Sequence, residues 1–339
     1  MKNVTISEVA KLAGVSTTTV SRVINNVKTV NEKNRQRVLE AIRTLKYKPN
    51  VSAQRLAGSK VNTISLIMPR FEDMFHSFYA IEILKGISVM VEKYNFDLLL
   101  HATDFSQIDL RAYDNMLNIT QSAGVLFADT DSNLAILERL KTEEIPFVVM
   151  NNYIEEPKVN CVGIENREGT KNLIRYLIKL GHTRIAIVTG DLKNQSARAR
   201  YYGFKEVLEE NNIKPDESYL MIGNWTKAFA RKAVSSLLGL EERPTAIFAS
   251  SDEMAYEVIL TLRENNMVVP GGISVVGFDD SPFSTLSEIE ITTVHQPLYE
   301  MARESCEILI KLIKEPNTPP IKKLLITSLV ERQSCKKID

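Results

Sequence analysis

Residues 5–25 read Thr5-Ile-Ser-Glu-Val-Ala-Lys-Leu-Ala-Gly-Val-Ser-Thr-Thr-Thr-Val-Ser-Arg-Val-Ile-Asn25, and this pattern predicts two short helices joined by a tight turn. Thr5 and Glu8 have the spacing of a capping box, which begins a helix. Gly14 can adopt the left-handed conformation that ends that helix. Ser16 is placed to cap the second helix, which we expect to run to about Asn25.

The side chains that this pattern leaves on the outside of the second helix are short, polar or cationic, namely Thr17, Thr18, Ser21 and Arg22. A helix that lies in a DNA major groove and contacts base edges needs side chains of this kind. A third helix follows, with Asn31 as its cap and apolar residues at helical spacing. The pattern therefore predicts a three-helix, helix-turn-helix domain, although a small helical domain of another kind shares much of it.

The charge distribution favours the DNA-binding interpretation. Residues 1–60 carry 12 Lys and Arg against three Glu, a net charge of +9. The whole chain is neutral, with 42 basic and 42 acidic residues, so residues 61–339 carry −9. A basic module joined to an acidic body is typical of a DNA-binding head on a larger domain.

These motifs, and others further along the chain, resemble those of the lactose-repressor family of bacterial transcription regulators. The resemblance covers nearly the whole sequence. The matching motifs are Val15-Ser-Thr-Thr-Thr-Val-Ser-Arg-Val-Ile-Asn25, Tyr47-Lys-Pro-Asn50, Ala53-Gln-Arg-Leu-Ala57, Leu180-Gly-His182, Ser196-Ala-Arg-Ala-Arg200, Ser274-Val-Val-Gly-Phe-Asp-Asp280 and Thr292-Thr-Val-His-Gln-Pro297.

The segment after Pro49 forms a helix of about two turns if Asn50 caps it, and so short a helix is marginal alone in water. The resemblance implies that it pairs with the same segment of a second subunit and enters the minor groove. Leu56 matches the family's intercalating leucine, which would kink the duplex. A plain linker remains the alternative. From the sequence pattern and the resemblance together, the expected DNA-binding residues are Thr5, Ser16, Thr17, Thr18, Ser21, Arg22, Asn25, Asn50, Ala53 and Leu56.

From Thr63 onward, short apolar runs alternate with amphipathic helices, which predicts parallel sheets covered by helices on both faces. The expected strands are 63–68, 96–101, 124–127, 147–150, 161–164, 184–188, 246–249 and 274–278, and the expected helices include 81–94, 169–180, 199–211 and 254–265. This many units suits two doubly wound subdomains better than one. The fold class is therefore a helix-turn-helix head with a hinge helix, followed by an α/β core that resembles periplasmic binding proteins.

The resemblance also implies the domain boundaries. The expected domains are 1–48 for the head, 49–60 for the hinge helix and linker, and 61–339 for the effector-binding core. Within the core we expect an N-subdomain of 61–160 and 291–321, and a C-subdomain of 161–290 and 322–339. Ligands of such sheets bind at the carboxyl ends of the strands, here in a cleft between the subdomains.

Polar and aromatic residues at the expected strand ends are the candidates for the effector site. A guanidinium fork such as that of Arg200, which the resemblance places on the ligand, suits paired hydroxyls or a carboxylate. Trp225 matches an aromatic position that packs on a sugar ring. For Asp252 the alternative is a cap on the following helix, and Asp280 is expected to be structural. The expected effector-binding residues are Phe75, His76, Asn151, Arg200, Trp225, Asp252, Asp279 and Gln296.

The sequence contains no GxSxG, Walker A, GxGxxG or HExxH motif, and its isolated cysteines have no metal-ligand spacing, so neither an enzyme nor a metal or cofactor is expected. The N-terminus runs directly into a capped helix and no membrane span is apparent, so we expect a cytoplasmic protein. A periplasmic sugar-binding protein shares the expected core, but the basic head argues against it.

The predicted function is a homodimeric repressor of carbohydrate-utilisation genes that binds pseudo-palindromic operator DNA and responds to a small-molecule effector, for which a sugar is the expected class. Two alternatives keep the fold, namely a nucleobase or other non-sugar corepressor, or a catabolite-control regulator whose partner is a phosphocarrier protein. Glu307 stands where the resemblance places those regulators' phosphate-binding arginine, and an acid there repels phosphate.

Overall fold

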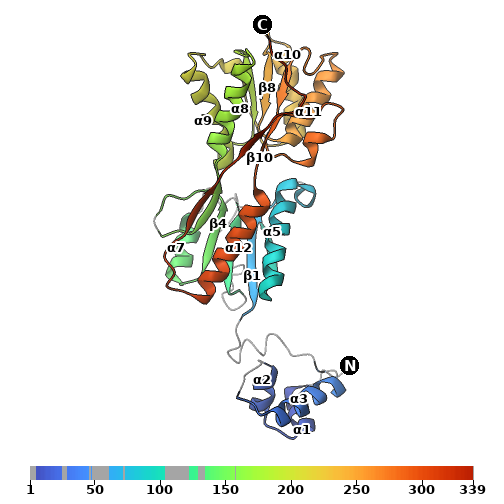
Figure 1. Cartoon of the computed structure of the whole chain (residues 1–339), viewed down its shortest axis with the longest axis vertical. Coiled ribbons are helices and arrows are strands. Elements are labelled where there is room, and N and C mark those ends of the chain that lie inside the picture. The colour runs from blue at the N-terminus through green and yellow to red at the C-terminus, as the bar shows by residue number, and fades with distance from the viewer. Residues whose placement is uncertain are drawn as a thin grey trace. The chain divides into compact units, whose positions relative to one another are not determined.

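The computed structural model describes residues 5–24, 29–45, 47, 61–71, 73–103, 122–128, 134–156 and 158–338. The chain divides into two units, Met1–Val61 and Asn62–Asp339 (Figure 1). The predicted hinge helix at 49–60 lies outside the described residues, as do the predicted DNA contacts Asn25, Asn50, Ala53 and Leu56. Within the described ranges, no helix combines the length and the apolar character needed to cross a bilayer.

The described residues of the first unit form three helices, α1 (Ile6–Ala13), α2 (Thr17–Ile24) and α3 (Glu32–Leu45). The predicted capping box is confirmed, because Thr5 Oγ1 accepts the Glu8 amide and the Thr5 amide donates to Glu8 Oε2 at 2.7 Å. Gly14 ends α1 at φ 62°. The Ser16 hydroxyl accepts the Thr19 amide at 3.2 Å, and Asn31 Oδ1 accepts the Asn34 amide at 2.8 Å.

One apolar core holds the three helices together. Its buried members are Val9, Ala10, Ala13, Val20, Val23, Val38 and Ala41. They come from one face of each helix, as helical spacing requires. The opposite face of α2 is left for solvent or a partner.

The second unit begins with lobe 1, which is built on a six-stranded parallel sheet of order β11-β5-β4-β3-β1-β2. The strands are β1 (Thr63–Pro69), β2 (Asp97–Thr103), β3 (Gly124–Ala128), β4 (Phe147–Asn151), β5 (Cys161–Ile164) and β11 (Lys322–Leu325). The helices among its described residues are α5 (Phe78–Tyr94), α7 (Leu134–Thr142) and α12 (Leu298–Lys314), and η1 (Met74–His76) follows β1.

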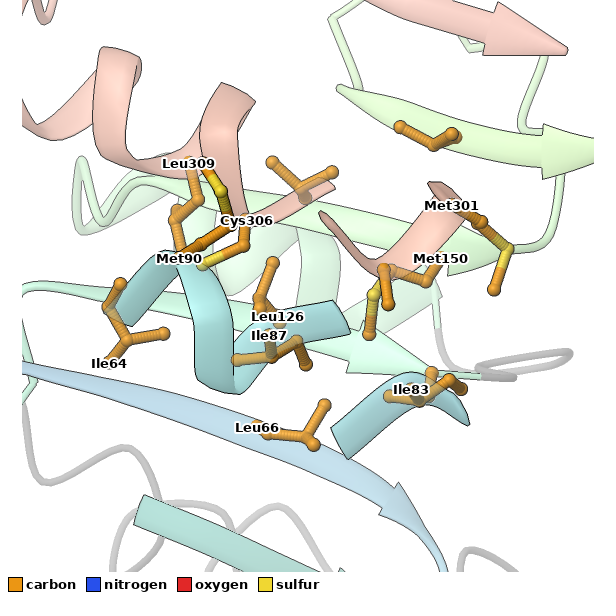
Figure 2. Close-up of a cluster of buried hydrophobic side chains, with 14 of the residues drawn as sticks. Ile64, Leu66, Ile83, Ile87, Met90, Leu126, Met150, Met301, Cys306 and Leu309 are labelled. Atoms are coloured by element: carbon orange, nitrogen blue, oxygen red, sulfur yellow. The ribbon is translucent and has the colours of Figure 1, made fainter. Parts of the chain in front are cut away.

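Alternate residues of these strands face opposite sides of the sheet, as strand geometry requires. Ile64 and Leu66 of β1 pack with side chains of α5 and α12 (Figure 2). Ile67 of β1 instead packs with side chains of α7. Lobe 1 therefore has helices on both faces, as the apolar strand runs predict.

Lobe 2 is built on a four-stranded parallel sheet of order β7-β6-β8-β9. The strands are β6 (Ile185–Thr189), β7 (Leu220–Ile222), β8 (Ala246–Ala249) and β9 (Ser274–Val276). One face packs against α8 (Asn166–Lys179) and α9 (Gln195–Glu210), the other against α10 (Lys227–Leu238) and α11 (Asp252–Glu264). Two short 3₁₀ helices, η3 (Glu217–Tyr219) and η4 (Pro282–Thr285), complete the lobe.

The antiparallel pair β10 (Thr293–His295) and β12 (Ser328–Val330) lies beside β9, because Thr292 bridges Val276 in parallel. The strands therefore place the chain crossings later than expected. β5 and β11 pair with each other in the lobe 1 sheet, whereas β10 belongs to lobe 2. The expected crossings near 161, 290 and 322 are wrong by a few residues, since the chain leaves a sheet only after the last paired residue of its strand. The crossings lie at Glu165, Pro297 and 326–327.

Close helix packing in lobe 1 gives a stability prediction. A Cβ atom on Gly86 of α5 would lie 2.4 Å from the Tyr299 carbonyl oxygen and 2.8 Å from Ala302 Cβ of α12, whereas one on Gly239 would meet nothing closer than 3.4 Å. We expect Gly86→Ala to lower the free energy of unfolding by about 1–3 kcal/mol through overpacking. Gly239→Ala should stay within about 0.5 kcal/mol of wild type.

Urea denaturation followed by circular dichroism measures both variants. Equal midpoints for Gly86→Ala and Gly239→Ala would show that α5 and α12 are not in this close contact.

Candidate functional site

The outward face of α2 gathers the predicted base-contacting residues of the described region. Thr17, Thr18 and Arg22 are exposed and Ser21 is half-buried, while Val20 and Val23 point into the core. Ser16 caps α2, and Thr5 caps α1, where its hydroxyl also contacts the Glu8 carboxylate at 3.0 Å. The sequence thus produces a short helix with a polar, cationic face on a rigid apolar base.

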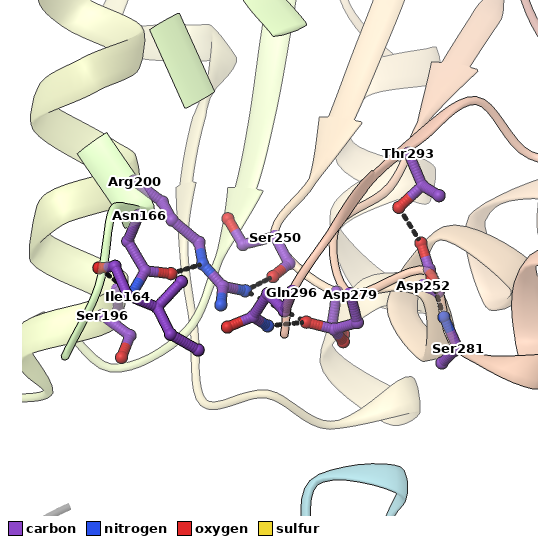
Figure 3. A network of polar contacts seen from close by, with 12 residues as sticks. Ile164, Asn166, Ser196, Arg200, Ser250, Asp252, Asp279, Ser281, Thr293 and Gln296 are labelled. Carbon is purple, nitrogen blue, oxygen red and sulfur yellow. Dashed lines mark hydrogen bonds and ion pairs between the residues drawn. The ribbon is translucent and has the colours of Figure 1, made fainter. Parts of the chain in front are cut away.

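Arg200 is the centre of a second group of residues, at the carboxyl edge of the lobe 2 sheet (Figure 3). Its side chain is buried, with 3% of its surface exposed. Nε donates to Asn166 Oδ1 at 2.9 Å, Nη1 donates to the Ser250 carbonyl, and Nη1 lies 3.5 Å from Asp279 Oδ1. The guanidinium carbon also lies 3.8 Å from the Phe278 ring centroid.

Asp279 is the counter-charge of Arg200 and follows β9. It has φ 124°, and its amide donates to the Val294 carbonyl at 2.9 Å, which ties its loop to β10. The Gln296 amide nitrogen donates to Asp279 Oδ1 (Figure 3). Burial raises the pKa of Asp279 to about 6, against the opposing effects of Arg200 and of the Gln296 hydrogen bond. Asp279 therefore changes charge near neutral pH.

Asp252 does not fit the predicted effector role. Its side chain is fully buried, Oδ2 accepts the Ser281 amide at 2.7 Å, and Oδ1 accepts the Thr293 hydroxyl at 2.6 Å (Figure 3). Ser251, rather than Asp252, caps α11 by accepting the Met254 amide. Burial and the nearby charge of Asp279 raise the pKa of Asp252 well above its usual range. Both carboxylate oxygens serve the fold, so Asp252 connects β10 to the loop after β9.

Asp280 has the structural role expected of it. Its carboxylate contacts the Arg332 guanidinium and lies 3.1 Å from His295 Nδ1. The neighbouring acids 279 and 280 therefore have different environments. Asp280 joins strand ends to each other, whereas Asp279 faces Arg200.

Three buried polar atoms at or just after strand ends of lobe 2 have no hydrogen-bond partner within the part of the chain that the structure describes. They are Thr189 Oγ1, Ser250 Oγ and Gln296 Oε1. Thr189 ends β6, Ser250 follows β8, and the two strands are neighbours. Buried polar atoms normally have partners, so these atoms indicate a place where a ligand or water is bound. Sequence reasoning missed Thr189 and Ser250, although their position directly after apolar strands could have marked them.

The remaining predicted residues lie at different places. Trp225 is half-buried at φ 66°, and its ring lies so close to Gly190 that a Cβ atom there would clash; Arg200 is 5.5 Å from the ring centroid. Asn151, at the end of β4, donates to Ser196 Oγ at 3.2 Å across the two lobes. Phe75, 66% exposed, and His76 are on the surface of η1 rather than among the buried groups.

Comparison with known proteins identifies the family. Residues 5–50 match the family described as bacterial regulatory proteins, lacI family, and residues 174–335 match the periplasmic binding protein-like domain. The chain is 31% identical to the probable HTH-type transcriptional repressor ExuR of Bacillus subtilis over 99% of each chain. This chain belongs to the lacI family. It is also 33% identical to catabolite control protein A of Priestia megaterium over 92% of each chain.

Solved structures of lacI-family regulators are similar throughout. The lac repressor dimer bound to operator and the anti-inducer ONPF has a TM-score of 0.85 with this chain. The two chains are 26% identical, over 99% of this chain and 100% of that chain. The complex of the transcriptional regulator CelR with cellobiose has a TM-score of 0.75 at 30% identity, over 98% and 100%. The predicted fold class is confirmed, and the chain is a DNA-binding transcriptional regulator with a ligand-binding core.

The exposed face of α2 gives a prediction about base reading. An arginine that contacts guanine O6 and N7 contributes about 1–3 kcal/mol of discrimination. We expect Arg22→Ala to weaken binding to the DNA that wild type selects from a random-sequence pool by this amount, and to relax the preference at one base position. Fluorescence anisotropy measures affinity, and repeated selection measures preference.

Arg43→Ala is the matched control, because it removes the same charge from an exposed position on α3. Should Arg22→Ala weaken every DNA sequence equally, Arg22 contacts phosphate and not a base.

The raised pKa of Asp279 predicts a dependence of stability on pH. A carboxyl group whose pKa is about 6 when folded holds its proton more tightly in the folded state. The resulting stabilisation is complete below the unfolded pKa of about 4 and is lost as pH rises through about 6. Relative to Asp279→Asn, we therefore expect wild type to lose stability between pH 4 and pH 6.5, and to change little above that.

Thermal unfolding of both proteins across this range measures the difference. Parallel curves for wild type and Asp279→Asn would place Asp279 in an environment that water reaches freely.

Proposed function

We propose that this regulator is a homodimeric repressor of carbohydrate-utilisation genes whose operator affinity depends on a neutral sugar bound near Arg200. The two α2 helices of the dimer read the half-sites of a pseudo-palindromic operator. The sugar binds between the lobes, at the carboxyl ends of β6 and β8. The ligand of the CelR complex and the operator of the lac repressor complex support this assignment.

The observation that carries the proposal is the set of buried, unpartnered atoms Thr189 Oγ1, Ser250 Oγ and Gln296 Oε1. Two are hydroxyls, which donate and accept, and one is an amide oxygen, which accepts. A sugar carries several hydroxyls that can satisfy such a mixed set. The indole of Trp225, beside Arg200, offers an apolar face for the C–H side of the ring.

The charges favour a neutral ligand over an acidic one. Arg200 is already compensated by Asp279, and Gln296 donates to the same carboxylate. A neutral sugar leaves this ion pair intact. An acidic ligand would compete with Asp279 for Arg200 and would be repelled by its charge.

The same contacts explain how the ligand could control DNA binding. Gln296 directly precedes Pro297, where the chain crosses from lobe 2 into lobe 1. A ligand that bonds to Gln296 and Asp279 therefore acts on a crossing segment. A ligand shifts an equilibrium only by its preference for one arrangement. We take the ligand to be an inducer, which favours the arrangement with low operator affinity.

A phosphorylated carrier protein is the second candidate partner, because the chain is similar to catabolite control protein A. Glu307 is exposed on α12, where the resemblance places an arginine in regulators of that kind. A carboxylate at this position repels a phosphate. The residues therefore favour a small-molecule effector, with a nucleobase as the competing class.

Titration with a panel of ligands tests the proposal directly. Tryptophan fluorescence of the full-length protein is followed during addition of neutral mono- and disaccharides, acidic sugars, sugar phosphates and nucleobases. Trp225 is the only tryptophan, so a saturable change reports on its surroundings. We expect one neutral sugar to respond, and Asp279→Asn to weaken its binding about tenfold or more, since a hydrogen bond to a charged group contributes about 1.5–3 kcal/mol.

Glu209→Gln, on the exposed end of α9, is the control and should bind as wild type does. If no sugar changes the tryptophan fluorescence, calorimetry confirms that none binds, and DNA binding is intact, the sugar proposal is contradicted. A response to an acidic sugar or a nucleobase would overturn the neutral-sugar assignment instead.

A further inference from the structure

The side chain of Gln195 joins the two lobes. Its Nε2 donates to the Tyr153 carbonyl at 3.0 Å, and its Oε1 accepts the Tyr153 amide at 2.8 Å. Tyr153 lies two residues after β4 of lobe 1, whereas Gln195 is the first residue of α9 in lobe 2. One primary amide therefore satisfies both backbone groups of one residue, as a neighbouring strand would.

Each end of this contact is fixed to its own lobe. On the lobe 1 side, Lys322 Nζ donates to the Ile154 carbonyl at 2.7 Å and to the Glu155 carbonyl at 2.8 Å, which holds the segment after Tyr153 against β11. On the lobe 2 side, Asn194 caps α9 by accepting the Ala197 amide at 3.2 Å. Asn194, and not Gln195, therefore performs the capping of α9.

The contact requires glutamine. Glutamate would keep the acceptor but lose the donor, and asparagine is one methylene shorter. A small rotation of either lobe would break both hydrogen bonds together, because they share one planar amide. The neighbouring bond from Asn151 to Ser196 crosses the lobes at the same place.

The position along the chain connects this contact to the candidate ligand site. Gln195 and Arg200 lie on the same helix, α9, which packs against α8 through Phe204 and Val207. Tyr153 lies beside β5, since a Cβ atom on Gly163 would contact it at 3.3 Å. β5 ends at the first chain crossing. The contact thus connects a helix that carries a candidate ligand residue to a segment next to the crossing.

We infer that Gln195 is a positioning residue that braces the two lobes in the arrangement seen here, by a two-bond contact to the Tyr153 backbone next to the crossing. Loss of the brace loosens the crossings without removing any predicted ligand contact. Any effect of this brace on the ligand response rests on the proposed function, whereas the contact between Gln195 and Tyr153 does not depend on it.

Amide hydrogen exchange of the full-length protein without ligand tests this inference. Gln195→Met keeps the length of the side chain and removes the donor and acceptor, and Glu209→Ala controls for a substitution on the exposed surface of α9. In Gln195→Met we expect the Tyr153 amide to exchange about 5- to 30-fold faster, because two ordinary hydrogen bonds are lost. The amides of Glu165 and Gln296, which are bonded at two of the crossings, should also exchange faster.

The core strand β8 should exchange at the wild-type rate in every variant, and Glu209→Ala should match wild type throughout. Gln195→Glu keeps the acceptor for the Tyr153 amide and should give an intermediate result. Unchanged exchange at Tyr153 overturns the inference. Faster exchange at Tyr153 alone, with Glu165 and Gln296 unchanged, would show a local turn contact and would also overturn the inference. An increase in the exchange rate of β8 equal to that of Tyr153 would overturn it as well. Because no ligand is added, these outcomes are independent of the sugar proposal.

Discussion

The constraint on which this core depends is the burial of the Arg200 guanidinium. A buried charge costs several kcal/mol unless it is paired and hydrogen-bonded. Here α8 supplies Asn166, the end of β8 supplies the Ser250 carbonyl, and the loop after β9 supplies Asp279. The positions of a helix, a strand end and a loop are therefore fixed by one side chain. The carboxyl edge of the lobe 2 sheet takes its shape from that requirement.

Two acidic residues with different structural roles, Asp252 and Asp279, connect this edge of the sheet to the chain crossing at Pro297. Asp252 binds Ser281 and Thr293 and holds β10 to the loop after β9. Asp279 faces Arg200 and accepts from Gln296, the residue before the crossing at Pro297. One acid that is bonded only to the fold and one acid that faces Arg200 thus lie at the same edge of the sheet. This arrangement suits a regulator, in which the ligand site must be rigid enough to be selective and must still influence the lobes.

Local sequence signals predicted the head well. The caps at Thr5, Ser16 and Asn31 depend on residues within three positions, so the sequence alone reveals them. The crossings were misplaced because the pairing of β5 with β11 joins residues about 160 positions apart, and only the fold brings them together. The resemblance supplied Arg200, and the position at a strand end supplied Asp279. Thr189 and Ser250 also lie at strand ends, but that signal alone did not single them out. The sequence could not reveal the partners of Asp252, because Ser281 and Thr293 lie 29 and 41 positions further along the chain.

The central claim is that the ligand site and the DNA-binding face are two sites of one equilibrium. The most direct test is to measure operator affinity with and without saturating ligand, and ligand affinity with and without saturating operator. Linkage requires the factor by which the ligand changes operator affinity to equal the factor by which the operator changes ligand affinity. Regulation requires this factor to differ from one, typically by about 5- to 150-fold. We predict equal factors within this range. A ligand that binds near Arg200 with both factors equal to one would contradict the account.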